Sequence, residues 1–412
     1  MKVHLPKARI VQPHGPLNGE IRDLWFENGA LISPPTKPSG DAVDTLDEGC
    51  FVSAGWVDLR ARSFDPGMPE RETLTSLLHA ADAGGYEQVG ILPVTEPTAD
   101  HSAVIEYAKN RSQGTHSRPL FIGALSRGME GRELAELQEL KESGAIAFSD
   151  GGRPIANAHF LKVAMEYSAM LGIPLILRPD DPFLFGTGAA RESVNSFRSG
   201  MAGIPAVSEV IGMDRIAELA RYTSCSVHLT SISTKEGLDR LRQYRSKDYP
   251  LTADVAIAHL VLGQEGLLDF DTNWKQVPPL GSEDDQKALI EGLCDGSIDA
   301  VVSDHHPVNV EQKVCTYQEA EEGISCIQAT HSLLRSVPGM SEERFIELMS
   351  SGPRRILGLS EPDFQPGGPG GYTLYRPDAK TEYTTENWHS TSSNFPFLGQ
   401  TLPGEVQGCM RS

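Results

Sequence analysis

Short apolar runs alternate with stretches of helical spacing along the middle of the chain, and this alternation limits the fold most strongly. We expect eight strands, at 51–59, 88–94, 119–124, 145–148, 173–177, 226–231, 251–257 and 298–303. Helical patterns fall between most of them, at 72–83, 132–143, 155–170, 211–222, 234–243 and 283–294. Strands that are apolar along most of their length are buried on both faces, as in parallel sheets with right-handed crossovers. The pattern predicts an α/β fold, a (β/α)8 TIM barrel.

The two ends of the chain have a different pattern. Residues 1–50 contain short alternating runs and turn signals, and residues 359–412 are rich in Gly, Pro, Ser and Thr. We expect these two segments to form short strands that pair into one small β-domain. The barrel would then comprise residues 51–358.

Composition excludes several classes of partner and location. The net charge is -20, from 36 Lys+Arg and 56 Asp+Glu, and no basic stripe is present, which argues against nucleic acid. No apolar run approaches the roughly 18 residues of a membrane span. The six Cys form no Cys-x-x-Cys pair and the first residues lack a basic-then-apolar leader. We therefore expect a cytoplasmic protein with reduced thiols.

Reacting groups in such a barrel lie where the strands end. The segments that follow the expected strands resemble those of dihydroorotase, an amidohydrolase-superfamily enzyme of pyrimidine synthesis. The resemblance covers nearly the whole chain, including Gly-Ala-Ile-Ala-Phe-Ser-Asp at 144–150, Phe-Asp-Thr-Asn-Trp-Lys at 270–275 and Ser-Asn-Phe-Pro-Phe-Leu-Gly at 393–399. It implies a barrel that hydrolyses a cyclic amide with one or two zinc ions.

The chain departs from this family at the metal ligands that the resemblance implies. Four places that hold His in the family carry other residues: Arg60, Arg62, Arg178 and Ser231. Asp150 remains from an acidic pair, and Asp304, the family's ligand and general base, remains next to His305. Contacts to the substrate are also replaced, by Phe64, Val94, Val277, Gly281 and Val308.

Elementary coordination chemistry gives these replacements a consequence. Zinc needs imidazole, thiolate or carboxylate donors, and a guanidinium has no lone pair to offer. Water without a metal keeps a pKa near 15.7 instead of about 7. We therefore expect no bound metal, no cofactor and no catalytic residue, which would make the chain a pseudoenzyme. We expect Arg60, Arg62 and Arg178 to neutralise Asp150 and Asp304 instead.

The chain thus resembles the non-catalytic dihydroorotase-like chains that some bacteria pair with aspartate carbamoyltransferase. That resemblance implies a structural subunit in a hetero-oligomer with the catalytic chain of the transferase. Two alternatives stay open. The chain could be an active zinc amidohydrolase whose metal is held by Asp150, Asp304 and His305, which bound zinc and ring opening would reveal. It could also be an anion-binding regulatory subunit, whose binding would be lost in Arg60→Ala or Arg178→Ala.

Several polar residues have simpler interpretations. We expect His228 to be a hydrogen-bonded core histidine and Cys326 to be a buried thiol rather than a nucleophile. The pair Asp180-Asp181 precedes Pro182 and is typical of a turn or helix cap. We expect His305 to be a residue inherited from the dihydroorotase family and His306 to fill a loop. We do not expect the pair to bind a metal.

Overall fold

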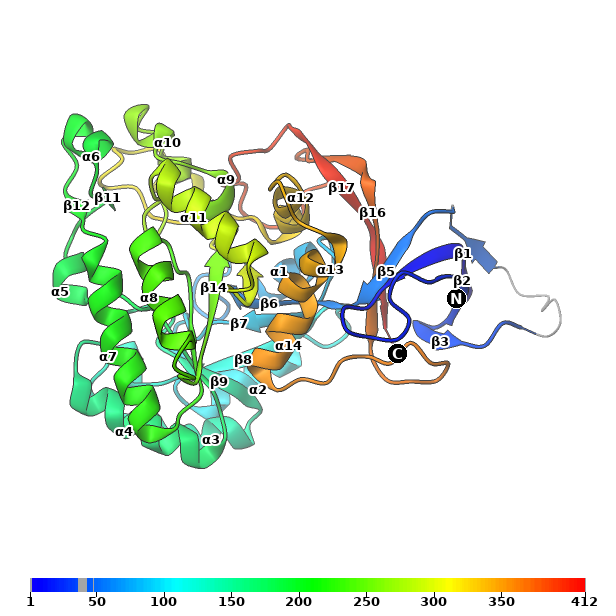
Figure 1. Ribbon diagram of the computed structural model, residues 1–412, viewed down its shortest axis with the longest axis horizontal. Helices are drawn as coiled ribbons and strands as arrows, with labels where there is room; N and C mark the ends of the chain where they lie inside the picture. Colours follow the sequence, from blue (N-terminus) through cyan, green and yellow to red (C-terminus); the bar gives the residue numbers. More distant parts are fainter. Residues whose placement is uncertain (1, 36–42, 47, 412) are drawn as a thin grey trace.

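Eight parallel strands form one sheet in the computed structural model, which describes residues 2–35, 43–46 and 48–411. Their order is β15-β14-β13-β10-β9-β8-β7-β6. The strands are β6 (Trp56–Ala61), β7 (Tyr86–Ile91), β8 (Arg118–Ala124), β9 (Ala145–Ser149), β10 (Leu175–Leu177), β13 (Val227–Leu229), β14 (Leu251–Ala256) and β15 (Ala300–Val302). Ala61 bridges to His305, just beyond β15, so the sheet is a nearly closed barrel (Figure 1). The fold class is confirmed, and each of the eight predicted strands overlaps a strand of this sheet.

The predicted helices surround this barrel. They are α1 (Leu74–Ala83), α3 (Leu137–Glu142), α4 (Ala158–Leu171), α7 (Val207–Thr223), α8 (Lys235–Arg245) and α11 (Glu283–Cys294). Side chains of Thr73, Asn157 and Ser282 accept backbone N–H groups at the start of α1, α4 and α11, which satisfies donors that a helix leaves free. No described helix is long and apolar enough to cross a membrane.

Other helices and a short pair of parallel strands were not predicted from the sequence. They are α2 (Ser102–Arg111), α5 (Pro182–Phe185), α6 (Val194–Ser199), α9 (Ala258–Val261), α10 (Glu265–Leu268), α12 (Thr330–Arg335), α13 (Glu342–Ile346), α14 (Gly352–Leu357), β11 (Ala190–Arg191) and β12 (Gly203–Ile204). Most of them are six residues or shorter, too short to give a clear helical period in sequence.

The remaining strands form a second sheet, which lies beside the barrel (Figure 1). Its order is β17-β16-β5-β1-β2-β3, and β4 also pairs with β1. The strands are β1 (Lys2–Val11), β2 (Ile21–Glu27), β3 (Ala30–Ile32), β4 (Val43–Thr45), β5 (Phe51–Ala54), β16 (Gly371–Glu382) and β17 (Thr401–Arg411). The antiparallel pair β5 and β16 joins strands from the two ends of the chain. Domain boundaries at residues 51 and 358 stay a prediction.

The single strand predicted at 51–59 is two strands in the structure. Gly55 separates them, and its N–H donates to the Gly371 carbonyl at 2.9 Å. Its own carbonyl accepts from Ser350 and Arg354, so the backbone leaves one sheet and enters the other there. Trp56, fully buried, then packs against Tyr86 of the barrel and Tyr375 of β16. Trp56 therefore contacts apolar side chains of both sheets at the point where the chain passes from one to the other.

Candidate functional site

Two arginines and one carboxylate meet at the mouth of the barrel, where the strands end. Arg60 and Arg62 lie on and just after β6, and Asp304 follows β15, the neighbouring strand. Arg60 Nε lies 2.6 Å from Asp304 Oδ1, and Arg62 Nη1 lies 3.2 Å from the same oxygen. All three side chains are buried. The expected pairing of Arg60 and Arg62 with Asp304 is therefore present.

Arg178 contacts neither of the two carboxylates predicted for the three arginines, and among the described residues Asp150 has no arginine partner. Arg178 Nε lies 2.9 Å from Asp180 Oδ2, and its guanidinium stacks over the Phe185 ring at 4.6 Å. Asp150 Oδ1 accepts the N–H groups of Leu125 and Ser126 at 3.1 and 2.9 Å. The prediction that arginines neutralise Asp150 is wrong, because neighbouring backbone donors already satisfy this carboxylate. Burial raises the pKa of Asp150.

The other predicted residues divide into two groups. Phe64, Val94 and Val277 line a cavity of about 590 Å³ at the mouth, together with Arg62, Asp150 and Arg178. Ser231 is fully buried, and its N–H donates to Asp254 Oδ1 at 2.6 Å. The structure thus gathers six of the twelve predicted positions around one cavity, while Ser231 lies just after β13 and bonds to Asp254 of β14.

Three cations of the mouth were not singled out in sequence: Arg71, Arg153 and Lys275. Arg71 Nη2 donates to Glu321 Oε2 at 2.9 Å, across a separation of 250 positions that no local pattern reveals. Lys275 Nζ donates to the carbonyls of Gln318 and Ala320 at 2.9 and 2.6 Å. Backbone carbonyls carry no net charge, so the charge of Lys275 is not neutralised by these contacts.

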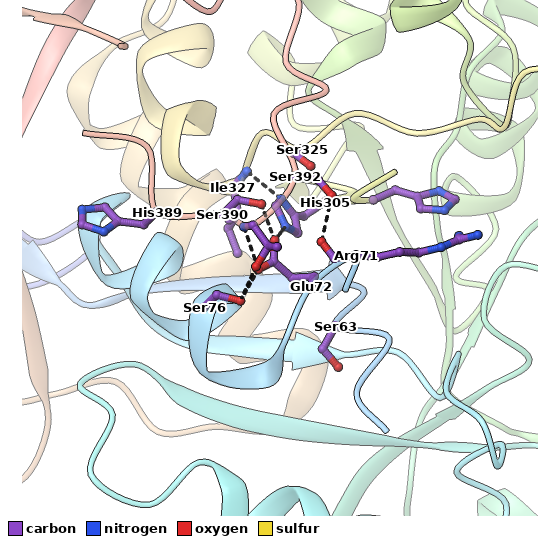
Figure 2. A network of polar contacts seen from close by, with 12 residues as sticks. Ser63, Arg71, Glu72, Ser76, His305, Ser325, Ile327, His389, Ser390 and Ser392 are labelled. Atoms are coloured by element: carbon purple, nitrogen blue, oxygen red, sulfur yellow. Dashed lines mark hydrogen bonds and ion pairs between the residues drawn. The ribbon is translucent and has the colours of Figure 1, made fainter. Parts of the chain in front are cut away.

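His305 faces away from this cavity, toward a buried glutamate (Figure 2). Its Nε2 lies 3.3 Å from Glu72 Oε2, and Ile327 N–H donates to its Nδ1 at 3.4 Å. Glu72 also accepts the hydroxyls of Ser76 and Ser390 and the N–H of Thr391, the last at 3.1 Å. Both ring nitrogens of His305 are engaged, so it ties the segment after β15 to Glu72 and Ile327, while Glu72 fixes the segment around residue 390 to the start of α1.

The simpler interpretations of the remaining polar residues are confirmed. His228 contacts Thr252 Oγ1 at 2.9 Å and Asp254 Oδ2 at 2.8 Å, which satisfies both ring nitrogens. Cys326 Sγ donates to the Ser303 carbonyl, and burial raises the pKa of this thiol. Asp181 accepts the N–H groups of Phe183 and Leu184, as a helix cap does. Burial and the nearby Arg62 lower the pKa of His306, which keeps its ring neutral.

The donors of the mouth do not fit a zinc ion. Within residues 2–35, 43–46 and 48–411, no group of three or more His, Cys, Asp or Glu could hold a metal. Arg60 and Arg62 already share the Asp304 oxygen, and a guanidinium donates hydrogen bonds but offers no lone pair. Two buried cations at this carboxylate also repel a divalent ion.

Asp58, two residues before Arg60 on β6, gives this barrel a pH-dependent stability. Burial raises its pKa to about 7. Because the pKa is raised, Asp58 stays protonated in the folded state at pH values where the unfolded chain has already released this proton. The free energy of unfolding therefore falls as pH rises from about 4 toward 8. We expect Asp58→Asn, which is always neutral, to lose about 2 kcal/mol less stability than the wild type between pH 5.5 and 8. Urea unfolding at both pH values measures this, and parallel curves would contradict it.

Comparisons with known proteins identify a family and several proteins to which this chain is similar. A family profile described as Dihydro-orotase-like matches residues 49–237. A protein of Desulforapulum autotrophicum named Dihydroorotase is 34% identical over 98% of this chain and 96% of its own length. One of Geobacter metallireducens with the same name is 32% identical over the same shares. L-hydantoinase from Arthrobacter aurescens superimposes with a TM-score of 0.83 at 18% identity, over 98% of this chain and 93% of its own, which supports the barrel fold.

These relatives overturn one prediction. The replaced His ligands led us to expect that the chain is not an enzyme, but relatives that match it from end to end carry an enzyme's name. The loss of imidazole ligands removes one way to activate water and does not by itself define the class of the protein. The mismatch between the mouth and a zinc ion remains a feature of this particular chain.

Proposed function

Because the chain belongs to the dihydroorotase family, we propose that it serves pyrimidine synthesis as a subunit that binds the catalytic chain of aspartate carbamoyltransferase. The observation that carries this proposal is an apolar rim on short helices and loops that lie close in sequence to residues lining the mouth cavity. We define the rim by its exposed side chains, Val194, Phe197, Leu268, Phe270, Val310 and Val314. Large exposed apolar groups that gather on neighbouring segments are typical of protein-binding surfaces.

The rim is built on segments that pack against one another. Ala190, Met201, Leu267 and Tyr317 form a small buried cluster between them. Thr272 Oγ1 donates to the Lys313 carbonyl at 2.7 Å, and Lys313 Nζ donates to the Thr272 carbonyl at 3.0 Å. Phe197 is nevertheless 86% exposed and Val314 77% exposed. The segments beneath these exposed apolar side chains are well packed and hydrogen-bonded. We therefore interpret the rim as a docking surface and not as a loosely packed loop.

Co-expression with the transferase chain from the same genome tests this proposal. We expect the two chains to co-elute from a sizing column as one complex, with a mass by light scattering above that of either chain alone. Phe197→Asp combined with Val314→Asp should weaken the complex at least about tenfold, because charges would be buried without partners.

Met170→Asp is the matched control, since Met170 is 75% exposed on α4, outside the rim. This variant should co-elute as the wild type does. Separate elution of the wild-type chains, or equal loss in both variants, would contradict the proposal. Ring opening of dihydroorotate is assayed on the same preparations, so that assembly and hydrolysis are measured separately.

A further inference from the structure

Arg191, on the short strand β11, is a buried cation whose hydrogen-bond donors are mostly unused. The residue is 3% exposed. Its Nη2 donates to the uncharged hydroxyl of Ser233 at 2.7 Å, whereas Nε and Nη1 have no hydrogen-bond partner among the described residues. A buried donor without an acceptor is costly, and so is a buried charge without an opposite charge. Arg191 therefore favours an acceptor that comes from outside the chain.

A buried carboxylate, Glu209, is bonded to the same serine and balances the charge of Arg191 only in part. Ser233 Oγ donates to Glu209 Oε2 at 2.6 Å, and Thr234 Oγ1 donates to Oε1 at 2.9 Å. Burial raises the pKa of Glu209 to about 7, although the charge of Arg191 acts in the opposite direction. Glu209 is therefore ionised in only part of the molecules at neutral pH, so Arg191 keeps an excess of positive charge.

A small cavity lies beside Arg191. Its volume is about 10 Å³, close to the roughly 10–15 Å³ that one water-sized particle needs. Its walls are mainly apolar, and the residues that line it with Arg191 include Gln264, Leu267, Trp274, Leu280 and Tyr317. This volume excludes phosphate, sulfate and carboxylates, which have several heavy atoms. The cavity and the mouth cavity have no lining residue in common.

We propose that Arg191 binds a halide ion, chloride in ordinary solutions, in this cavity. A halide accepts hydrogen bonds from several directions, so one ion can bond both Nε and Nη1 and also balance the charge of the guanidinium. A water molecule could accept the same hydrogen bonds, but it carries no charge. The apolar walls suit a halide because it is more weakly hydrated than a carboxylate or a phosphate.

The ion would also strengthen the base of the rim. Ala190, Leu267 and Tyr317 line this cavity and belong to the buried cluster between the segments of the rim. A halide bound to Arg191 would therefore hold β11, α10 and the segment around residue 317 together. The site goes beyond the proposed assembly role and does not rest on it, because the isolated chain should bind the ion.

Bromide tests the site directly, since it scatters X-rays anomalously and water does not. The full wild-type chain is crystallised with sodium bromide in place of sodium chloride. We expect an anomalous peak in this cavity, in contact with Nε and Nη1 of Arg191. A water molecule in the cavity without an anomalous peak, or bromide peaks at other places only, would overturn the proposal.

Thermal melting measures the same binding in solution. We expect sodium chloride to raise the melting temperature at least about 2 °C above its value in sodium methanesulfonate of equal ionic strength, because a ligand of the folded state stabilises it. Methanesulfonate has the charge of chloride but is too large for the cavity. Arg191→Met should abolish this difference between the two salts.

Arg198→Met is the matched control, because Arg198 is an exposed arginine on α6 that does not line the cavity. This variant should keep the difference between the salts. Equal melting of the wild type in both salts, a difference retained in Arg191→Met, or an equal loss in both variants would contradict the proposal. The bromide measurement uses the wild-type chain, so it decides the proposal even if Arg191→Met does not fold.

Discussion

Asp304→Asn is expected to lower the free energy of unfolding by about 3–5 kcal/mol. The substitution keeps the size of the side chain and removes the charge that both Arg60 and Arg62 share. Arg60 is fully buried and cannot turn to water, so its charge would be left unpaired. Urea unfolding at pH 7, monitored by circular dichroism, measures the loss.

The matched control is Asp214→Asn, which breaks an Arg–Asp pair near the surface. Asp214 binds Arg240 through contacts of 2.6 and 2.7 Å, and roughly a third of each side chain is exposed. Exposed pairs contribute at most about 1 kcal/mol, so the control should lose far less than Asp304→Asn. Adding Arg62→Met to Asp304→Asn should recover part of the loss. Equal losses at Asp304 and Asp214 would contradict burial as the cause.

The barrel and the main ion pair of its mouth could be predicted because both follow from regular geometry. Parallel strands buried on both faces leave continuous apolar runs, and all eight appear in the sequence. The carboxyl ends of such strands meet at one edge, which brings Arg60 of β6 close to Asp304 after β15 although they are 244 positions apart. The remaining pairing partners depend on loop geometry, which has no period to detect.

Arg178 shows where that reasoning stops. Its partner is Asp180, two residues away, and not Asp150 or Asp304, the two carboxylates expected to pair with the three arginines. Asp150 is satisfied by the backbone after β8. Hydrogen bonds from nearby backbone N–H groups, such as those to Asp150, compete with long-range ion pairs for the same carboxylate. The spacing of residues in the sequence does not show which of the two forms. The short helices α6 and α10 escaped prediction for a related reason, since their exposed apolar residues belong to no core.

Glu72→Ala is expected to release the segment around residues 390–392 and to cost about 3–5 kcal/mol of stability. Glu72 is fully buried and holds Ser76, His305, Ser390 and Thr391 through one carboxylate (Figure 2). Its removal leaves several buried donors without an acceptor, so this part of the chain should open more often than the rest. Hydrogen exchange of the Thr391 amide, which donates to Glu72 Oε1, should become at least about tenfold faster.

Two variants separate this network from a general loss of packing. Glu72→Gln keeps the length of the side chain and two of its acceptor sites, so it should lose less stability than Glu72→Ala while still exposing the segment to exchange. Glu139→Ala removes an exposed carboxylate that accepts the Ser102 hydroxyl, and it should cost less than about 1 kcal/mol. Unchanged exchange at residues 390–392 in Glu72→Ala would show that other contacts hold the segment. Ser392 Oγ, which donates to the Arg71 carbonyl at 2.8 Å, would then be the first to consider.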